Sequence, residues 1–121
     1  MATPDIINVA TIEGVMIAGA VANSAADVID VAADKTYKLN TVIISNVDGT
    51  NDATVSAKVS VDNGSNYYHI AKTVTVPADS SVHLITKDSS IYLDETDLLN
   101  LAASADNMLE YVISYETLDD A

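Results

Sequence analysis

The chain has 121 residues, the size of one domain, and its 18 acidic residues against 5 lysines give a formal charge of -13. It contains no arginine and no cysteine, which argues against binding nucleic acid or anionic lipid and excludes disulfides and thiolate metal sites. Hydrophobic residues make up 49% of the chain, too many for a disordered acidic tail.

Short strands are predicted in the first third of the chain, at residues 6–12, 15–21 and 28–31. Alanines between residues 18 and 33 leave a helical turn as the alternative. Residues 1–13 are interpreted as an arm that pairs with a neighbouring subunit, or as the first strand of the sandwich. Residues 14–121 are predicted to form a single β-sandwich domain. Because the N-terminus lacks a basic leader, we expect synthesis in the cytoplasm without an export signal.

The strongest strand signals lie in the middle of the chain. Residues 54–61 alternate apolar and polar, which is typical of a strand with one wet face. Residues 37–47 are apolar on both faces, which predicts a central strand covered on both sides, in part by a neighbouring subunit. Its expected faces are Leu39, Thr41 and Ile43 on one side, and Val42 and Ile44 on the other.

Further strands are predicted at residues 67–76, 82–86, 90–93, 97–103 and 109–116. Residues 48–52 and 62–66 are rich in Gly, Asn and Asp, which is typical of hairpin loops. Short strands at this spacing predict an all-β fold, an antiparallel β-sandwich of the jelly-roll or Ig-like kind with about eight strands.

No motif of catalysis or cofactor binding is found. His69 and His83 lie outside any metal or catalytic pattern, and the acidic residues at 94–97 and 48–52 are interpreted as turn residues, with a hard cation as the alternative. We predict no catalytic, cofactor-binding or metal-binding residues and no enzymatic activity. A Ser-His-Asp triad is the remaining enzyme alternative, since its members are distant in sequence.

Two consecutive tyrosines, Tyr67 and Tyr68, open one predicted strand. Successive strand residues face opposite sides, so one tyrosine is expected to enter the core and the other to face outward. The outward tyrosine would either anchor a partner or cover a sheet edge.

The order of several turns and strand ends resembles a known family. The segments are 31–35 (VAADK), 38–46 (KLNTVIISN), 59–64 (VSVDNG), 67–68 (YY), 70–72 (IAK), 76–80 (VPADS), 91–93 (IYL) and 114–116 (SYE). Together they resemble the small β-sandwich virion proteins of tailed bacteriophages, which are capsid decoration (cement) proteins or tail-associated proteins. The resemblance covers residues 28–117. It departs at Thr96, where the family often has Gly, and at Ala32, where it tends to have Pro.

The resemblance implies a decoration protein that binds the outer capsid shell and bridges neighbouring major capsid subunits. Its partners would be the major capsid protein and itself, as a homo-oligomer with a trimer as the expectation, and its location the virion surface. The interface is predicted at Ile6, Ile7, Val9, Val42, Ile44, Tyr67 and Tyr68. The alternative is a tail or fibre module that recognises a host surface ligand through loops 48–52, 62–66 and 94–97, gathered at one end.

Overall fold

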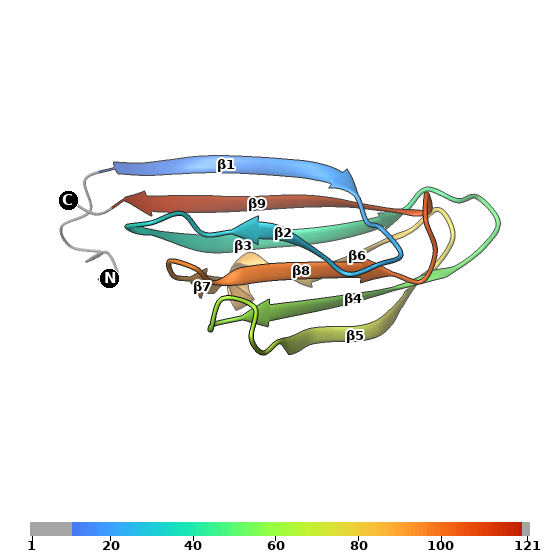
Figure 1. Ribbon diagram of the computed structural model, residues 1–121. Coiled ribbons are helices and arrows are strands. Elements are labelled where there is room, and N and C mark those ends of the chain that lie inside the picture. Colours follow the sequence, from blue (N-terminus) through green and yellow to red (C-terminus); the bar gives the residue numbers. More distant parts are fainter. Residues whose placement is uncertain (1–10, 120–121) are drawn as a thin grey trace.

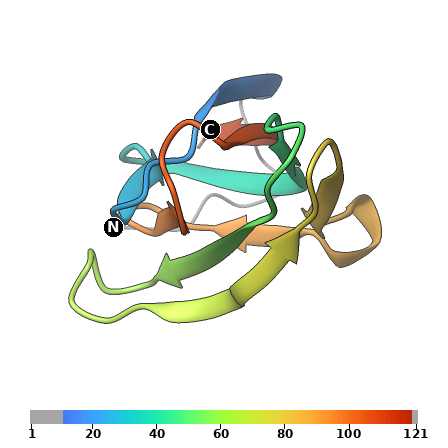
Figure 2. The same ribbon diagram turned by 90° about the vertical axis from the view of Figure 1, so that its right-hand side faces the viewer.

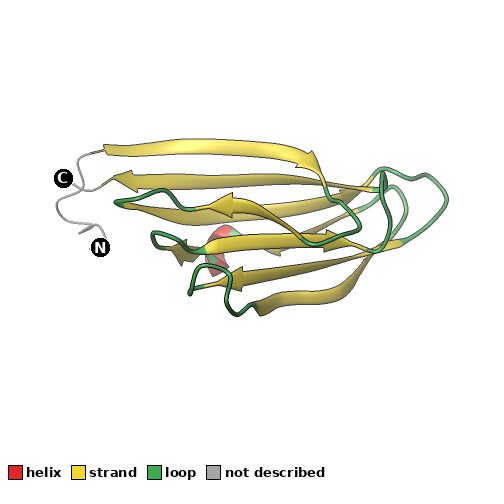
Figure 3. Ribbon diagram, viewed as in Figure 1, coloured by secondary structure: helices red, strands yellow, loops and turns green. Residues whose placement is uncertain are grey.

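The computed structural model describes residues 11–119, which form two antiparallel sheets packed face to face (Figures 1 and 3). The all-β sandwich is therefore confirmed, whereas the alternative of a helical turn between residues 18 and 33 is wrong. Within these residues, no helix is long and apolar enough to cross a membrane. The strands are β1 (Thr11–Ala20), β2 (Ala26–Asp30), β3 (Lys35–Asn46), β4 (Ala53–Ser60), β5 (Tyr68–Val76), β6 (Ser81–Ile85), β7 (Ile91–Leu93), β8 (Leu98–Ala103) and β9 (Leu109–Asp119), with a 3-10 turn, η2 (Lys87–Ser89), before β7.

The strand order is that of a jelly roll. One sheet runs β1-β9-β3-β6, with β7 also paired to β3, and the other runs β2-β8-β4-β5. Strands β6 and β7 pair with different parts of β3, so together they occupy one strand position at the edge of the five-stranded sheet. The first strand then pairs with the last, the second with the last but one, and so on inward to β4 with β5. This nested pairing selects the jelly roll over the Ig-like arrangement.

The first strand begins earlier than the sequence boundary suggested. Strand β1 pairs with β9 from Thr11 to Ala20 without a register shift. Residues 11–13 therefore belong to the sandwich, and the expected boundary between residues 13 and 14 falls inside a strand. The predicted interface residues Ile6, Ile7 and Val9 lie outside the described residues.

The core lies between the sheets and takes one set of alternate side chains from each strand. The register between β3 and β9 shifts between Leu39 and Thr41. This bulge places Leu39 on the same side as Val42 and Ile44, and all three are fully or almost fully buried. Burying one such side chain stabilises the fold by about 1.5–3 kcal/mol. Leu39 was expected on the other face, because strict alternation does not allow for a bulge.

Candidate functional site

The outer face of the five-stranded sheet carries an apolar strip. Cross-strand pairing sets Ala18 of β1 beside Val112 of β9 and Ile43 of β3 in one row, with Met16 in the next row. We call Met16, Ala18, Val112 and Ile43 the outer strip. The other residues of the two rows are Ser114, Thr41 and His83, so neither row contains a carboxylate.

The outer strip is accessible. The side chain of Met16 is 68% exposed and Ala18 is also exposed, whereas Val112 and Ile43 are half-buried. Their strand neighbours Ile113 and Val42 point to the opposite side, into the core. An exposed apolar strip is unusual surface for a chain with a charge of -13, and such patches are typical of sites that contact partners.

Charged groups lie beyond both ends of the outer strip. Glu110 occupies the row on one side, beside Ala20. On the other side Glu116 pairs with Lys38, and Asn40 donates a hydrogen bond from Nδ2 to Glu116 Oε1 at 3.1 Å. The arrangement gives an apolar centre with a polar rim, as in many protein interfaces.

The outer face of the four-stranded sheet is polar instead. Asp27, Asn100 and Lys58 form a row across β2, β8 and β4. Asn100 Nδ2 donates to Asp27 Oδ1 at 3.0 Å, and the Tyr67 hydroxyl donates to the same oxygen at 3.0 Å. That hydrogen bond to Asp27 raises the pKa of Tyr67. The Lys58 Nζ lies 5.1 Å from the centre of the Tyr67 ring.

This geometry corrects the expectation for the two tyrosines. Tyr67 lies at the surface, held by Asp27 and Lys58, and Tyr68 is 63% exposed at the start of the edge strand β5. Neither ring enters the core. Tyr67 is used within its own domain, and Tyr68 lies on the other sheet from the outer strip, so neither tyrosine forms part of that strip.

The predicted interface on β3 is also corrected. Val42 and Ile44 are 1% and 0% exposed, because both face the opposite sheet. An interface on β3 must therefore use Thr41 and Ile43, on the outer face. Met16, Ala18 and Val112 were missed. The uncharged run at residues 14–22 was a usable signal for Met16 and Ala18, but it does not include Val112.

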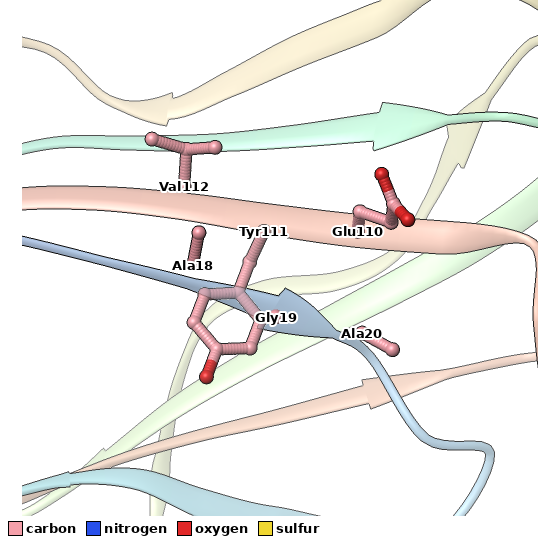
Figure 4. A pocket seen from close by; sticks show the side chains of 6 residues that line it. All are labelled: Ala18, Gly19, Ala20, Glu110, Tyr111 and Val112. Carbon is pink, nitrogen blue, oxygen red and sulfur yellow. The ribbon is translucent and has the colours of Figure 1, made fainter.

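A hollow of about 330 Å³ lies at the end of β1, lined by Gly19 and Tyr111 among others (Figure 4). Gly19 and Tyr111 are cross-strand partners. The Tyr111 side chain extends across Gly19, which has no side chain to obstruct it (Figure 4). The hollow thus lies beside the exposed edge of the sheet. Its lining residues are Ala18, Gly19, Ala20, Glu110, Tyr111 and Val112.

The acidic turn at residues 94–97 holds the neighbouring β2–β3 turn. Thr36 Oγ1 donates to Asp94 Oδ1 at 3.1 Å, and the backbone N–H of Asp34 donates to Glu95 Oε2 at 2.6 Å. Asp97 accepts a hydrogen bond from the Asp94 N–H. In the described part of the chain, no group of three acidic or histidine side chains is placed to hold a metal ion.

The carboxylates of the acidic loop at residues 48–52 also accept hydrogen bonds from nearby backbone groups. Asp48 Oδ1 accepts the backbone N–H groups of Thr50 and Asn51, and these bonds lower the pKa of Asp48. Asp52 Oδ1 accepts the N–H of Ala78 from the β5–β6 turn. These carboxylates therefore fold the loop and fasten it to the adjacent turn.

The three loops expected to gather at one end of the sandwich do not. Loop 48–52 is bonded to the β5–β6 turn, whereas turn 94–97 is bonded to residues 31–36. The two contacts lie at opposite ends, and loop 62–66 lies at the same end as turn 94–97 (Figure 1). The histidines are likewise separated, since His69 is exposed on β5 and His83 is exposed on β6 of the other sheet.

No family model and no curated protein matches the chain. Among solved structures, it is similar to a subunit of Bacillus endospore appendages, which are described as disulfide-linked pili. The sequence identity is 16% and the TM-score is 0.53, and the match covers 92% of this chain and 88% of that chain. Weaker likenesses are to an infectious bursal disease virus structure (8% identity, 91% and 32% covered, TM-score 0.48) and a pentameric capsid protein from metagenomic phage sequences (13%, 95% and 62%, TM-score 0.42). At these identities the likeness concerns the fold alone, and this chain has no cysteine for a disulfide linkage.

Proposed function

We propose that this chain is a structural virion protein that binds the outer shell of a phage capsid and bridges neighbouring major capsid subunits. The observation that carries the proposal is the outer strip, an exposed apolar surface without carboxylates on an otherwise strongly acidic protein. The resemblance of residues 28–117 to phage virion proteins supports the same role.

The mechanism is adhesive. Strands β9 and β3 lie inside the sheet, so they hold Val112 and Ile43 on a rigid surface. A rigid surface loses little entropy on docking. The net charge of -13 keeps free copies apart before assembly, while the strip brings no carboxylate into the contact. Each contact is modest, but many copies on one lattice bind with high avidity.

A binding assay with capsid shells that lack the protein tests the proposal. Ile43→Lys places a charge in the outer strip at a half-exposed position, where the lysine stem can still reach water. Tyr68→Lys is the matched control, since it replaces an exposed apolar side chain on the other sheet. We expect wild type and Tyr68→Lys to bind at micromolar concentration, and Ile43→Lys to bind at least about tenfold more weakly, a loss of 1.4 kcal/mol or more.

Circular dichroism of both variants controls for folding. Wild-type protein that does not bind the shells would contradict the proposed function. Equal binding by all three proteins would agree with the decoration role but would show that the outer strip does not contact the shell. The alternative of a host-recognition module loses the loop cluster on which it depended, because the acidic loops lie at opposite ends of the sandwich.

A further inference from the structure

Three of the four sheet edges are protected against pairing with another chain. Strand β2 has 5 residues, two of them aspartates, and a register shift against β8. Strand β5 carries Lys72 and a backbone kink at Thr73, whose φ is 48°, and its register against β4 shifts twice. Strands β6 and β7 are short and are separated by η2. Charges, bulges and short length all discourage edge-to-edge pairing.

The fourth edge, β1, has none of these features. It is a 10-residue strand with an unbroken register, and among the described residues it pairs with β9 alone (Figures 1 and 2). Glu13 is its only charged residue. A long, regular, weakly charged edge strand is a template for an added strand.

The backbone groups that face the open edge follow from the pairing. The N–H of Val21 donates to the carbonyl of Leu109 at 2.9 Å, so residue 21 points its backbone groups toward β9. In an antiparallel pair this direction alternates along the strand. The even-numbered residues of β1 therefore point their N–H and C=O groups to the open edge, with Met16 near the middle of the row.

We infer that β1 pairs antiparallel with β1 of a second copy, about a two-fold axis at Met16, and joins the two five-stranded sheets. In this register Ile12 of one copy lies opposite Ala20 of the other, and Met16 lies opposite its own equivalent. A large side chain thus meets a small one at each end of the contact. The outer strips of the two copies then form one continuous surface. A two-fold pair differs from the trimer that the resemblance implies.

The single charge of β1 favours the same register. Pairing about Met16 sets Glu13 of one copy opposite Gly19 of the other, where the Tyr111 hydroxyl lies over the vacant side-chain position. The carboxylate then has the Tyr111 hydroxyl within reach as a hydrogen-bond donor. Pairing about Val15 instead would set Glu13 opposite Ile17, which offers no donor. This complementarity to its own sequence is why we commit to a second copy as the occupant.

Single-cysteine variants of the full-length chain test the pairing, since the natural sequence has no cysteine. Met16→Cys places two thiols on a hydrogen-bonded pair, whose Cα atoms are about 5.5 Å apart, a distance that suits a disulfide. Ala20→Cys is the matched control, because its two copies would be offset by eight positions, roughly 26 Å. Both positions are exposed, so neither change disturbs the core.

Under mild oxidation we expect a covalent dimer from Met16→Cys, at least about tenfold more than from Ala20→Cys. A mixture of Ile12→Cys and Ala20→Cys should give the mixed dimer, because the two residues are opposite in the inferred register. Sedimentation of wild type should show a dimer that strengthens with salt, since salt screens repulsion between the acidic copies.

Three results would overturn the pairing. They are a monomeric Met16→Cys under oxidation, equal cross-linking of Met16→Cys and Ala20→Cys, or preferential cross-linking of Val15→Cys. The role of the dimer at the shell rests on the proposed function, but the cross-linking uses purified protein alone. Failure of wild-type protein to bind shells, alongside an intact Met16→Cys cross-link in purified protein, would therefore refute the function and leave the pairing standing.

Discussion

The ring of Tyr111 lies across Gly19 of the neighbouring strand, so a Cβ at Gly19 would lie 3.0 Å from the Tyr111 hydroxyl oxygen (Figure 4). A tyrosine that covers a glycine on an edge strand restores the contact surface that the glycine lacks, and it helps to fix the register. Here the same pair also shapes the hollow beside the open edge of β1.

Gly19→Ala should destabilise the protein relative to Gly14→Ala. At Gly19 the added methyl group pushes against the Tyr111 ring, whereas nothing lies within 4 Å of a Cβ at Gly14 on the same strand. Both changes reduce the entropy of the unfolded chain equally, so the comparison isolates the contact. We expect a difference of about 1–2 kcal/mol in the free energy of unfolding by urea. Equal stabilities would show that the ring moves aside without cost.

Removing the side chain of Asp27 should lower the stability of the fold more than removing the hydroxyl of Tyr67. Tyr67→Phe loses one hydrogen bond at the surface, so it should lower the urea midpoint only slightly. Asp27→Ala also leaves the amide of the buried Asn100 without its acceptor, which raises the cost to about 2–3 kcal/mol. Asp30→Ala, an exposed aspartate on the same strand, is the control and should change the urea midpoint little. A smaller effect for Asp27→Ala than for Tyr67→Phe would contradict this ranking.

Asn46, the last residue of β3, should contribute more to stability than any side chain of the β3–β4 loop that follows it. Its buried Nδ2 donates to the carbonyls of Asn51 and Val76 at 2.9 Å each, and its Oδ1 accepts the Asp48 N–H. Asn46→Ala leaves these groups unpaired. We expect the free energy of unfolding, measured by heat or urea, to fall by roughly 3 kcal/mol. Thr50→Ala at the exposed tip of the loop is the control, since only its backbone N–H is used. A loss below that of the control would refute this role for Asn46.

The charge of Asp97 should reduce stability at neutral pH. Burial raises the pKa of Asp97 above the ordinary value of 3.8, and the neighbouring Asp94 charge adds to the rise, although the Asp94 N–H opposes it. A raised pKa in the folded state means that the protonated form favours folding, so stability is gained as pH falls through that pKa. Asp97→Asn keeps an acceptor for the Asp94 N–H and removes the charge.

The melting temperature of Asp97→Asn should therefore exceed that of wild type by roughly 1–3 °C at pH 7. The difference should shrink as the pH falls through the pKa of the folded state, and it should vanish below 3.8, where both proteins are neutral at this site. A difference that does not change with pH would show that the substitution acts through packing rather than through charge.

Local patterns predicted the sandwich because each strand and turn follows from nearby residues. The alternation at residues 54–60 and the Gly/Asn turn at residues 62–66 gave β4 and its loop correctly. The bulge at Leu39 and Thr41 was missed, because it depends on how β3 pairs with β9, far along the chain. The position of loop 48–52 opposite turn 94–97 depends on topology for the same reason. The outer strip combines β1, β9 and β3, so no single segment of the sequence contains it.

The copy number of this chain in the virion decides whether it is a structural protein of the capsid surface. Parent virions would be separated into heads and tails, and the chain counted in each fraction by quantitative mass spectrometry against the major capsid protein. We expect many copies per particle in the head fraction, in a fixed ratio to the major capsid protein. A few copies confined to the tail fraction, or none in either fraction, would contradict it.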